Sequence, residues 1–308
     1  MSSMDTPFML LAAVLLDHWL GEPRRFHPLV GFGWLVLRVE QVAYGTSHVR
    51  GVVAVCALLL PPVAFAAWLQ SLETIGMLCS VLLLYFAIAP RSLREHAERV
   101  AAACGNDDLP AARSAVGRMV SRDTTQLNGE GVARATVESV LENGNDAIFS
   151  ALFWFAVAGA PGVVLCRLSN TLDAMWGYRN ARYNEFGWAA ARLDDVLNFI
   201  PARLTALSYA LLGHTRGALQ CWHTQAKHWE SPNAGPVMAA GAGALQVRLG
   251  GAAIYHGEIS ERPPLGCNAE VACGDIARAV QLVRRTLYVW LGVAVLGALL
   301  LAGWQRHV

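Results

Sequence analysis

The sequence predicts an all-α, polytopic integral membrane protein with three or four spanning helices. Of its 308 residues, 55% are hydrophobic and only 15% are charged, and the mean hydropathy is +0.37. Soluble domains of this length carry more charge, so the composition favours a membrane protein. Apolar segments recur along the chain, at about 7–20, 51–70, 72–89, 148–166 and 287–303. We expect them to build one membrane-embedded domain over residues 1–308.

Charge and cysteine content exclude several classes of protein. The net charge of +1 gives no global field that would attract nucleic acid. The seven cysteines form no Cys-x-x-Cys pair, which favours reduced, packed thiols over a disulfide framework or a zinc site. The sequence also lacks a phosphate loop and a dinucleotide-binding glycine motif. A nucleotide would therefore be held by arginines and a metal ion rather than by a glycine-rich loop.

The N-terminal apolar segment, 7–20, is short and lacks the basic flank and cleavage site of a signal peptide. We expect it to be a marginal span or an embedded helix. Asp17 near its end needs a polar partner, which makes it a candidate functional residue, although headgroup water would also satisfy it. The dipeptide His27-Pro28 predicts the start of the next helix, because proline favours the first helical turn.

Two apolar segments, 51–70 and 72–89, predict a helical hairpin that is kinked at Pro61-Pro62. Arginines flank this hairpin on both sides. The positive-inside rule therefore places residues 22–50 and 91–147 in the cytoplasm.

Segment 148–166 predicts a broken or re-entrant helix rather than a simple span. Gly159-Ala-Pro161-Gly162 lies inside it, where a helix would break. Residues 167–203 follow with arginines and no lysine, which matches the cytoplasmic bias of the preceding segment. We therefore expect both flanks of the broken helix, and residues 214–286, to face the cytoplasm.

The helix expected to begin near Asn128 carries Arg134, Glu138, Glu142 and Asp146 at intervals of four residues. These side chains share one face, and consecutive like charges at this spacing repel one another unless a cation lies between them. Mg²⁺ together with phosphate would be such a cation. The stripe is a candidate metal site, although a solvated helix face would have the same pattern.

The stretch 167–203 mixes arginines and carboxylates with aromatic residues between two apolar segments. Its members are Arg167, Arg179, Arg182, Arg192, Arg203, Asp173, Asp194, Asp195, Asn170, Asn180, Asn184, Asn198, Trp176, Tyr178, Tyr183, Phe186 and Trp188. Arginine binds phosphate and carboxylate through paired N–H donors. The stretch predicts a surface that binds a large ligand and its phosphate groups. A salt-bridged loop at a membrane interface would have the same residue composition.

The C-terminal part looks peripheral until the last apolar segment. Residues 204–213 are apolar but too few to cross a membrane. Ser231 to Pro236 predict a rigid turn, followed by a small-residue helix over 239–249 that suits close packing. The histidines of this region, at 214, 223 and 228, have no accompanying ligand pattern for zinc.

Several blocks occur in a fixed order between about residues 10 and 260. They are Leu16-Asp17 to Gly31, Val120 to Thr124, Val137 to Asn143, Asn170 to Met175, Gly177 to Asn180, Arg182 to Asp195, Asn198, Pro201 to Arg203 and Ser231 to Gly235. In this order they resemble the CobD/CbiB family of cobalamin-biosynthesis membrane proteins. The chain differs from the usual family pattern at Gly21-Glu22-Pro23, where Gly-Asp-Pro is common, and at Asn143 to Asp146, where Asn-Thr-Ser-Asp is common.

The resemblance implies adenosylcobinamide-phosphate synthase activity. Aminopropanol phosphate, or aminopropanol, would be joined by an amide bond to the free propionate of adenosylcobyric acid, with ATP and Mg²⁺ activating the carboxyl group. Glu138, Glu142 and Asp146 would hold the metal ion. The catalytic candidates are Asp173, Asp194, Asp195 and Arg192. The substrate and phosphate candidates are Asp17, His27, Arg122, Asn170, Tyr178, Arg179, Arg182, Tyr183, Arg203 and Asn233.

The same resemblance implies the surroundings of the protein. Trp176, Tyr178, Tyr183 and Trp188 could pack against the corrin or adenine, or anchor the chain at a membrane interface. The expected location is the cytoplasmic membrane, with the active site facing the cytoplasm. Neighbouring pathway enzymes and a second copy of the chain stay open as partners. A non-catalytic sensory or regulatory relative is the alternative function, and a transporter is a third, although segments 51–69 and 75–89 carry no charge.

Overall fold

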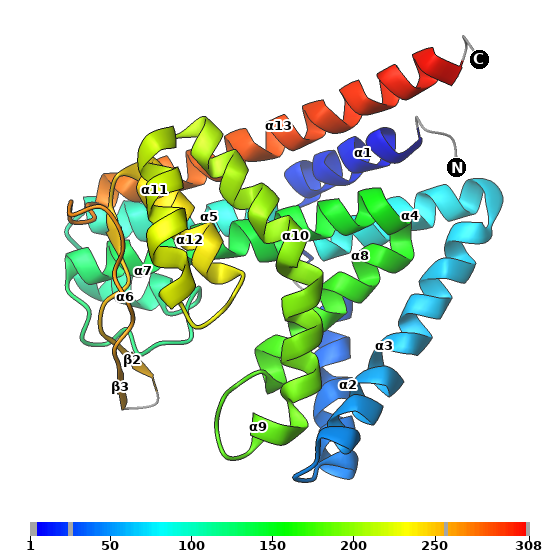
Figure 1. Ribbon diagram of the computed structural model, residues 1–308, viewed down its shortest axis with the longest axis horizontal. Coiled ribbons are helices and arrows are strands. Elements are labelled where there is room, and N and C mark those ends of the chain that lie inside the picture. The colour runs from blue at the N-terminus through cyan, green and yellow to red at the C-terminus, as the bar shows by residue number, and fades with distance from the viewer. Residues whose placement is uncertain (1–4, 24–26, 256–257, 306–308) are drawn as a thin grey trace. The chain divides into compact units, whose positions relative to one another are not determined.

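Helices make up almost the whole structure (Figure 1). The computed structural model describes residues 5–23, 27–255 and 258–305. The chain groups into two compact units that alternate along the sequence. Unit 1 comprises residues 1–89, 146–198 and 290–308, and unit 2 comprises residues 90–145 and 199–289. Neither unit is therefore a continuous stretch of sequence.

Each unit has its own set of helices. Unit 1 contains α1 (Asp5–Leu20), α2 (Pro28–Ala43), α3 (His48–Ser71), α4 (Glu73–Ala87), α8 (Ser150–Trp176) and α9 (Tyr183–Phe186). Unit 2 contains α5 (Pro90–Gly105), α6 (Leu109–Val116), α7 (Gly129–Gly144), α11 (Thr215–Gln225), a short 3-10 helix (Ala226–His228) and α12 (Ala234–Leu245). Both units include part of α10 (Trp188–Leu212) and of α13 (Cys273–Gln305), and a π-helical turn (Asn145–Phe149) joins α7 to α8.

Among the residues that the structure describes, four helical stretches are long and apolar enough to cross a membrane. They are His48–Ser71, Ile75–Gly105, Gly129–Trp176 and Cys273–Gly303. This confirms the predicted polytopic, all-α membrane protein with three or four spans. Helix α1, which holds the predicted marginal segment 7–20, has 16 residues and is not among the candidate spans of the described chain.

Sequence signals for helix starts are confirmed by the capping contacts. His27 Nδ1 accepts a hydrogen bond from the Leu29 amide at 3.2 Å, and Pro28 is the first residue of α2. Asn128 Oδ1 accepts from the Gly131 amide at 2.8 Å and begins α7 where the sequence predicted it. Such caps satisfy amides that have no partner within the helix. Helix α3 runs through Pro61-Pro62 without ending there, and the kink predicted at this pair stays a prediction.

The predicted break within segment 148–166 is confirmed at Gly159. This residue has φ 65° and ψ −149°, a backbone conformation that residues other than glycine rarely adopt. Pro161 follows two positions later in α8. Gln70, at the end of α3, reaches into the break, where its Oε1 accepts a hydrogen bond from the Ala160 amide at 2.6 Å. The break therefore has a side-chain partner for the amide that the kink exposes. Re-entry of this helix from one face stays a prediction.

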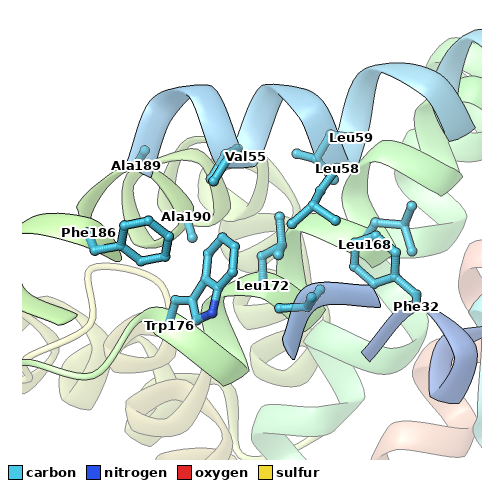
Figure 2. Packing of buried hydrophobic residues seen from close by; sticks show 12 residues of the cluster. Phe32, Val55, Leu58, Leu59, Leu168, Leu172, Trp176, Phe186, Ala189 and Ala190 are labelled. Atoms are coloured by element: carbon cyan, nitrogen blue, oxygen red, sulfur yellow. The ribbon is translucent and has the colours of Figure 1, made fainter. Parts of the chain in front are cut away.

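The core of unit 1 joins α2, α3, α8 and α9 to the start of α10 (Figure 2). Leu58 of α3 and Leu172 of α8 are buried beside Trp176, the last residue of α8. The Trp176 and Phe186 rings meet at an angle of 62°, with their centroids 4.9 Å apart. Burial of such large rings supplies much of the apolar stabilisation of a core. This core contains residues between Leu168 and Ala190 and so anchors that part of the predicted polar stretch 167–203.

In unit 2, the small residues of α12 allow α11 to approach closely. A Cβ on Gly243 would lie 2.5 Å from the carbonyl oxygen of Gly217, so no larger residue fits there without a shift. The close packing predicted for this helix is thus confirmed, but its predicted bounds, 239–249, are wrong. Gln246 adopts a left-handed conformation that ends the helix at Leu245.

Four short strands follow α12 and were not predicted. Strand β1 (Arg248–Leu249) pairs antiparallel with β4 (Leu265–Gly266), and β2 (Ala253–Tyr255) pairs antiparallel with β3 (Glu258–Ser260). Two or three residues are too few to show the alternation that marks a strand in sequence.

Candidate functional site

Glu40 of α2 fixes the polar loop that follows α8 in unit 1. Its Oε1 accepts hydrogen bonds from Arg182 Nε and Nη2, at 3.0 and 2.7 Å, and from the Tyr183 hydroxyl at 2.9 Å. Its Oε2 accepts from the Trp176 indole at 3.0 Å. The Arg182 guanidinium also lies 4.5 Å from the centre of the Tyr44 ring. Arg182 and Tyr183 thus hold the loop against α2, and the substrate contacts predicted for them stay predictions.

The aromatic residues of this stretch separate into buried and exposed groups. Trp176 is 0% exposed in the core of unit 1, so its predicted packing against corrin or adenine is wrong. Tyr178 and Trp188 are exposed at 47% and 44%. They remain available to a ligand or a membrane interface.

Four carboxylates lie close together in unit 1. Asp146 comes from the π-helical turn, Asp173 from α8, and Asp194 and Asp195 from α10. We call this group the aspartate cluster. The charges of Asp146, Asp173 and Asp195 all act on Asp194. Burial, reinforced by Asp146 and Asp173, raises the pKa of the Asp194 carboxyl to about 8, although a hydrogen bond from Asn198 opposes the rise. Near neutral pH, this carboxyl therefore exchanges a proton readily.

Asp195 lies beside the predicted arginines. Arg192 Nη1 approaches Asp195 Oδ2 to 3.3 Å, and the charge of Arg179 also acts on this carboxylate. Burial raises the pKa of Asp195, whereas the two arginines lower it. Arg192 and Arg179 are exposed, so the outer side of the cluster carries positive charge.

Arg167 connects the aspartate cluster to the N-terminal blocks. The charges of Asp146, Glu22 and Asp194 all act on its guanidinium. Its Nη1 donates a hydrogen bond to Asn170 Oδ1 at 3.4 Å, which brings that predicted residue to the cluster. Arg167 also acts on His27, whose Nε2 lies 3.9 Å from Glu22 Oε1. Glu22, His27, Asp146, residues 167–173 and residues 194–195 therefore converge within one unit.

Buried polar atoms in this region lack partners among the described residues. They include Arg167 Nε, Ser169 Oγ and Asp194 Oδ1. A buried donor or acceptor without a partner costs about 1–3 kcal/mol, so such atoms are usually paired with a ligand or water. One cationic donor and one carboxylate acceptor together can bind a molecule that has both an anionic oxygen and an N–H group.

Glu138 of α7 is held by arginines within unit 2. Arg262 Nη1 lies 3.0 Å from its Oε2, Arg122 bonds to the same oxygen, and the Gly250 amide donates to Oε1 at 2.7 Å. The side chains of Glu138 and Arg122 are 2% and 9% exposed. Glu138, one member of the predicted acidic stripe, is thus paired with cations that come from the chain itself.

The predicted magnesium site gains no support from this arrangement. Both oxygens of Glu138 are engaged, and Asp146 belongs to unit 1 whereas Glu138 and Glu142 belong to unit 2. Within residues 5–23, 27–255 and 258–305, no three His, Cys, Asp or Glu side chains are arranged to hold a metal ion. The three residues do not fit a preformed metal site, and magnesium binding by them stays a prediction.

Other predicted residues fall in both units. Asp17 is 2% exposed on α1. In unit 2, Arg203 Nη1 donates to Asn233 Oδ1 at 2.7 Å, which brings two predicted phosphate-binding residues into contact. Arg122, a third predicted phosphate-binding residue, forms an ion pair with Glu138.

Sequence reasoning missed the residues that organise these sites. Glu40 lies in α2 directly before Gln41 and two residues after Arg38, so nothing local in the sequence marks it as a buried carboxylate. Arg167 opens the polar stretch but was not singled out from the other arginines there. Arg262 is far from Glu138 along the chain, and nothing local in the sequence indicates the pair.

The fold and these clusters define a class: a polytopic helical membrane protein with buried carboxylates and arginines of the kind that handle charged substrates. The model of the family "CobD/Cbib protein" matches residues 10–283. The chain belongs to the CobD/CbiB family, whose members serve cobalamin biosynthesis.

Similar proteins cover nearly the full chain. The "Cobalamin biosynthesis protein CobD" of Stutzerimonas stutzeri is 60% identical over 97% of this chain and 100% of its own length. The protein of that name from Chromobacterium violaceum is 56% identical over 97% of this chain and 98% of its own. The one from Mycobacterium tuberculosis is 40% identical over 94% of each. No solved structure matches the chain.

Proposed function

We propose that this protein is an amide-forming ligase of cobalamin biosynthesis, an adenosylcobinamide-phosphate synthase. It joins the amine of aminopropanol phosphate, or of aminopropanol, to the free propionate of adenosylcobyric acid, with hydrolysis of ATP. The family membership supports the pathway. The observation that carries the reaction type is the buried, unpaired oxygen of Asp194 near the buried guanidinium of Arg167.

Amide formation needs a proton acceptor for the amine and a cation for the developing negative charge. At neutral pH the amine arrives as an ammonium ion, and the Asp194 carboxylate takes a proton from it. The free amine attacks the activated carboxyl carbon, a C–N bond forms, and the bond to the phosphate leaving group breaks. Arg167 offers its N–H donors to the negatively charged oxygen, the interaction that usually contributes most to such reactions.

ATP and magnesium belong to the proposal as the means of activating the propionate. Transfer of a phosphoryl group from ATP converts the carboxylate into an acyl phosphate, and the phosphate leaves when the amine attacks. Magnesium would screen the charge of the phosphates. We assign no residue to the metal ion, because the predicted set of Glu138, Glu142 and Asp146 does not fit a preformed site.

An amidation assay on detergent-purified protein tests the function. The mixture contains adenosylcobyric acid, aminopropanol phosphate, ATP and Mg²⁺, and the product is separated chromatographically. We expect amide product from the wild type and at least about a hundredfold less from Asp194→Asn, the usual loss when a proton acceptor is removed. Glu185→Gln, at an exposed acidic residue of α9, is the matched control and should keep wild-type activity. No product from the wild type would favour the sensory or regulatory alternative.

We also propose that the site faces the cytoplasm, since arginines flank the predicted spans on the side of the polar stretch. Asn184 is exposed in the loop of that stretch and can report its side of the membrane. An Asn184→Cys variant should react with a membrane-impermeant maleimide in inside-out vesicles and not in intact cells, beyond the labelling of the parent protein. Labelling in intact cells would place the loop outside.

A further inference from the structure

A cleft of about 720 Å³ is formed entirely by residues of unit 2. Its walls come from the end of α11, the short 3-10 helix and the turn before α12, with Arg203 of α10 completing it. The residues that matter for recognition are Arg203, Trp222, His223, Lys227, Trp229 and Glu230. We call it the tryptophan cleft. Volumes of about 300–1,000 Å³ hold cofactor-sized ligands, so the cleft is far too large for an inorganic ion alone.

The cleft combines aromatic faces with cations. Trp222 and Trp229 are half-buried, so each is fixed by packing and still has surface in the cleft. Lys227 and His223 are exposed at the same cleft, and Glu230 is its one acidic lining residue. Tryptophan stacks on planar heterocycles, and lysine and arginine bind phosphate oxygens.

Arg203 is held in place rather than free to swing. Its guanidinium lies 3.7 Å from the centre of the Phe199 ring. Nη1 donates to Phe199 O at 3.0 Å as well as to Asn233 Oδ1, and Nη2 donates to Pro232 O at 3.0 Å. A guanidinium has five N–H donors, so donors remain for a ligand in the cleft. An anion that binds there meets a cation whose position is already fixed, which lowers the entropic cost of binding.

We propose that the tryptophan cleft binds a nucleotide, with the base against a tryptophan ring and the phosphates against Arg203 and Lys227. Glu230 supplies an acceptor for a ribose hydroxyl or for the amine of the base. The assignment rests on the proposed function in one respect: the ligase reaction uses ATP, and this cleft then becomes its binding site. A simple phosphate ester without a ring would leave both tryptophans unused, and an apolar ligand would leave both cations unused.

The wall of the cleft is also connected to Glu138. The guanidinium of Arg262 lies 5.5 Å from the centre of the Trp229 ring, and the same guanidinium forms the ion pair with Glu138. A cation over one ring helps to hold that ring's orientation. Glu138 is thus linked to Trp229 through the Arg262 guanidinium.

Equilibrium binding to purified full-length protein in detergent tests the proposal. The probes are a non-hydrolysable ATP analogue, adenosine and inorganic phosphate, measured by calorimetry. We expect the ATP analogue to bind about tenfold or more weakly to Trp222→Ala and to Lys227→Gln than to the wild type. Matched controls are Trp34→Ala on α2 and Arg216→Gln on α11, both exposed and outside the cleft, and these should bind as the wild type does.

Equal affinity of all variants for the ATP analogue would overturn the proposal. Competition by anionic lipid would also overturn the proposal if it removed nucleotide binding from both the wild type and Arg216→Gln. The cleft would then be a site for lipid headgroups. The Asp194→Asn variant distinguishes failure of the nucleotide proposal from failure of the ligase proposal. It should bind the ATP analogue as the wild type does while forming at least about a hundredfold less amide. A wild type that binds through the cleft without forming amide contradicts the ligase function only. Amide formation with an unchanged KM for ATP in Trp222→Ala contradicts the cleft assignment only.

Discussion

Glu40 and Arg182 lie 142 residues apart in sequence, and their side chains meet through two hydrogen bonds of 2.7 and 3.0 Å to one carboxylate oxygen. The pair places the polar loop after α8 against α2, in a region where the carboxylate is buried and the arginine is half-exposed. Trp176 and Tyr183 donate to the same carboxylate. Four donor atoms from one loop thus depend on one acidic side chain.

Replacement of Glu40 should therefore destabilise the protein. In Glu40→Gln, the ion pair with Arg182 is lost and the amide cannot accept all of these hydrogen bonds, so we expect a loss of about 1–3 kcal/mol. The loss appears as a lower Tm in detergent. Glu185→Gln, an exposed residue in the same loop region, should change stability by less than about 0.5 kcal/mol. Similar Tm values for both variants would contradict the role assigned to Glu40.

Asp194 should give both activity and stability a dependence on pH. Charges that act on it are Asp146, Asp173 and Asp195, with Arg167 as the nearby cation. Its pKa is about 8 in the folded protein and about 4 in the unfolded chain. Only the ionised form accepts a proton, so amide formation should rise with pH up to about 8.

Stability should move in the opposite direction. Between pH 4 and pH 8, the folded protein holds a proton on Asp194 that the unfolded chain releases, so the free energy of unfolding falls as pH rises. Asp194→Asn removes this fall. The Tm of the variant relative to the wild type should therefore increase from pH 5 to pH 8.5 in parallel scans. A constant difference in Tm would show that Asp194 has an ordinary pKa.

Glu138 should be needed for folding whether or not magnesium is present. Glu138→Gln leaves Arg122 and Arg262 without their buried counter-charge, and loss of one partner of a buried pair costs about 3–5 kcal/mol. The matched control on α7 is Glu130→Gln, whose partner Arg134 is 3.5 Å away near the surface. It should cost under about 1 kcal/mol. If Glu138 acts as a metal ligand instead, its effect on Tm should disappear when EDTA is added to both proteins.

Gly159→Ala should destabilise the break in α8. A Cβ at this position would lie 2.2 Å from Gln70 Oε1, and the positive φ is unfavourable for alanine. We expect a loss of more than about 1 kcal/mol, seen as a lower Tm. Gly303→Ala at the end of α13, where a Cβ meets no atom within 4 Å, is the control and should not lower Tm. An unchanged Tm for Gly159→Ala would mean that the backbone there relaxes without cost.

Local patterns predicted where some helices begin or break, because these features depend on residues close in sequence, but they did not predict α10 across residues 188–212. The cap at Asn128, the start at Pro28 and the break at Gly159 follow from steric and hydrogen-bonding preferences of single residues. The clusters were harder to predict. The stripe of Glu138, Glu142 and Asp146 predicted a metal ion, whereas Glu138 pairs with Arg122 and Arg262, and periodicity cannot identify an arginine so far away in the sequence.

The aspartate cluster was predicted in part. Asp173, Asp194 and Asp195 were singled out from composition and resemblance, and the structure brings them together with Asp146 in one unit. Arg167 was one arginine among several in the same stretch. Only the fold shows that the charges of Asp146, Glu22 and Asp194 act on its guanidinium, whereas Arg192 and Arg179 act on Asp195.

The alternation of the two units along the chain has a consequence for biosynthesis. Unit 1 needs the segment that begins at residue 290 as well as residues 1–89, so it cannot be completed until that late segment has been synthesised. Glu40 is synthesised more than a hundred residues before its partners Trp176, Arg182 and Tyr183, so its carboxylate stays without them for part of synthesis. An incompletely packed unit exposes such groups together with apolar surface, a state that chaperones normally shield. We therefore expect C-terminally truncated forms to be degraded rather than to accumulate as stable fragments.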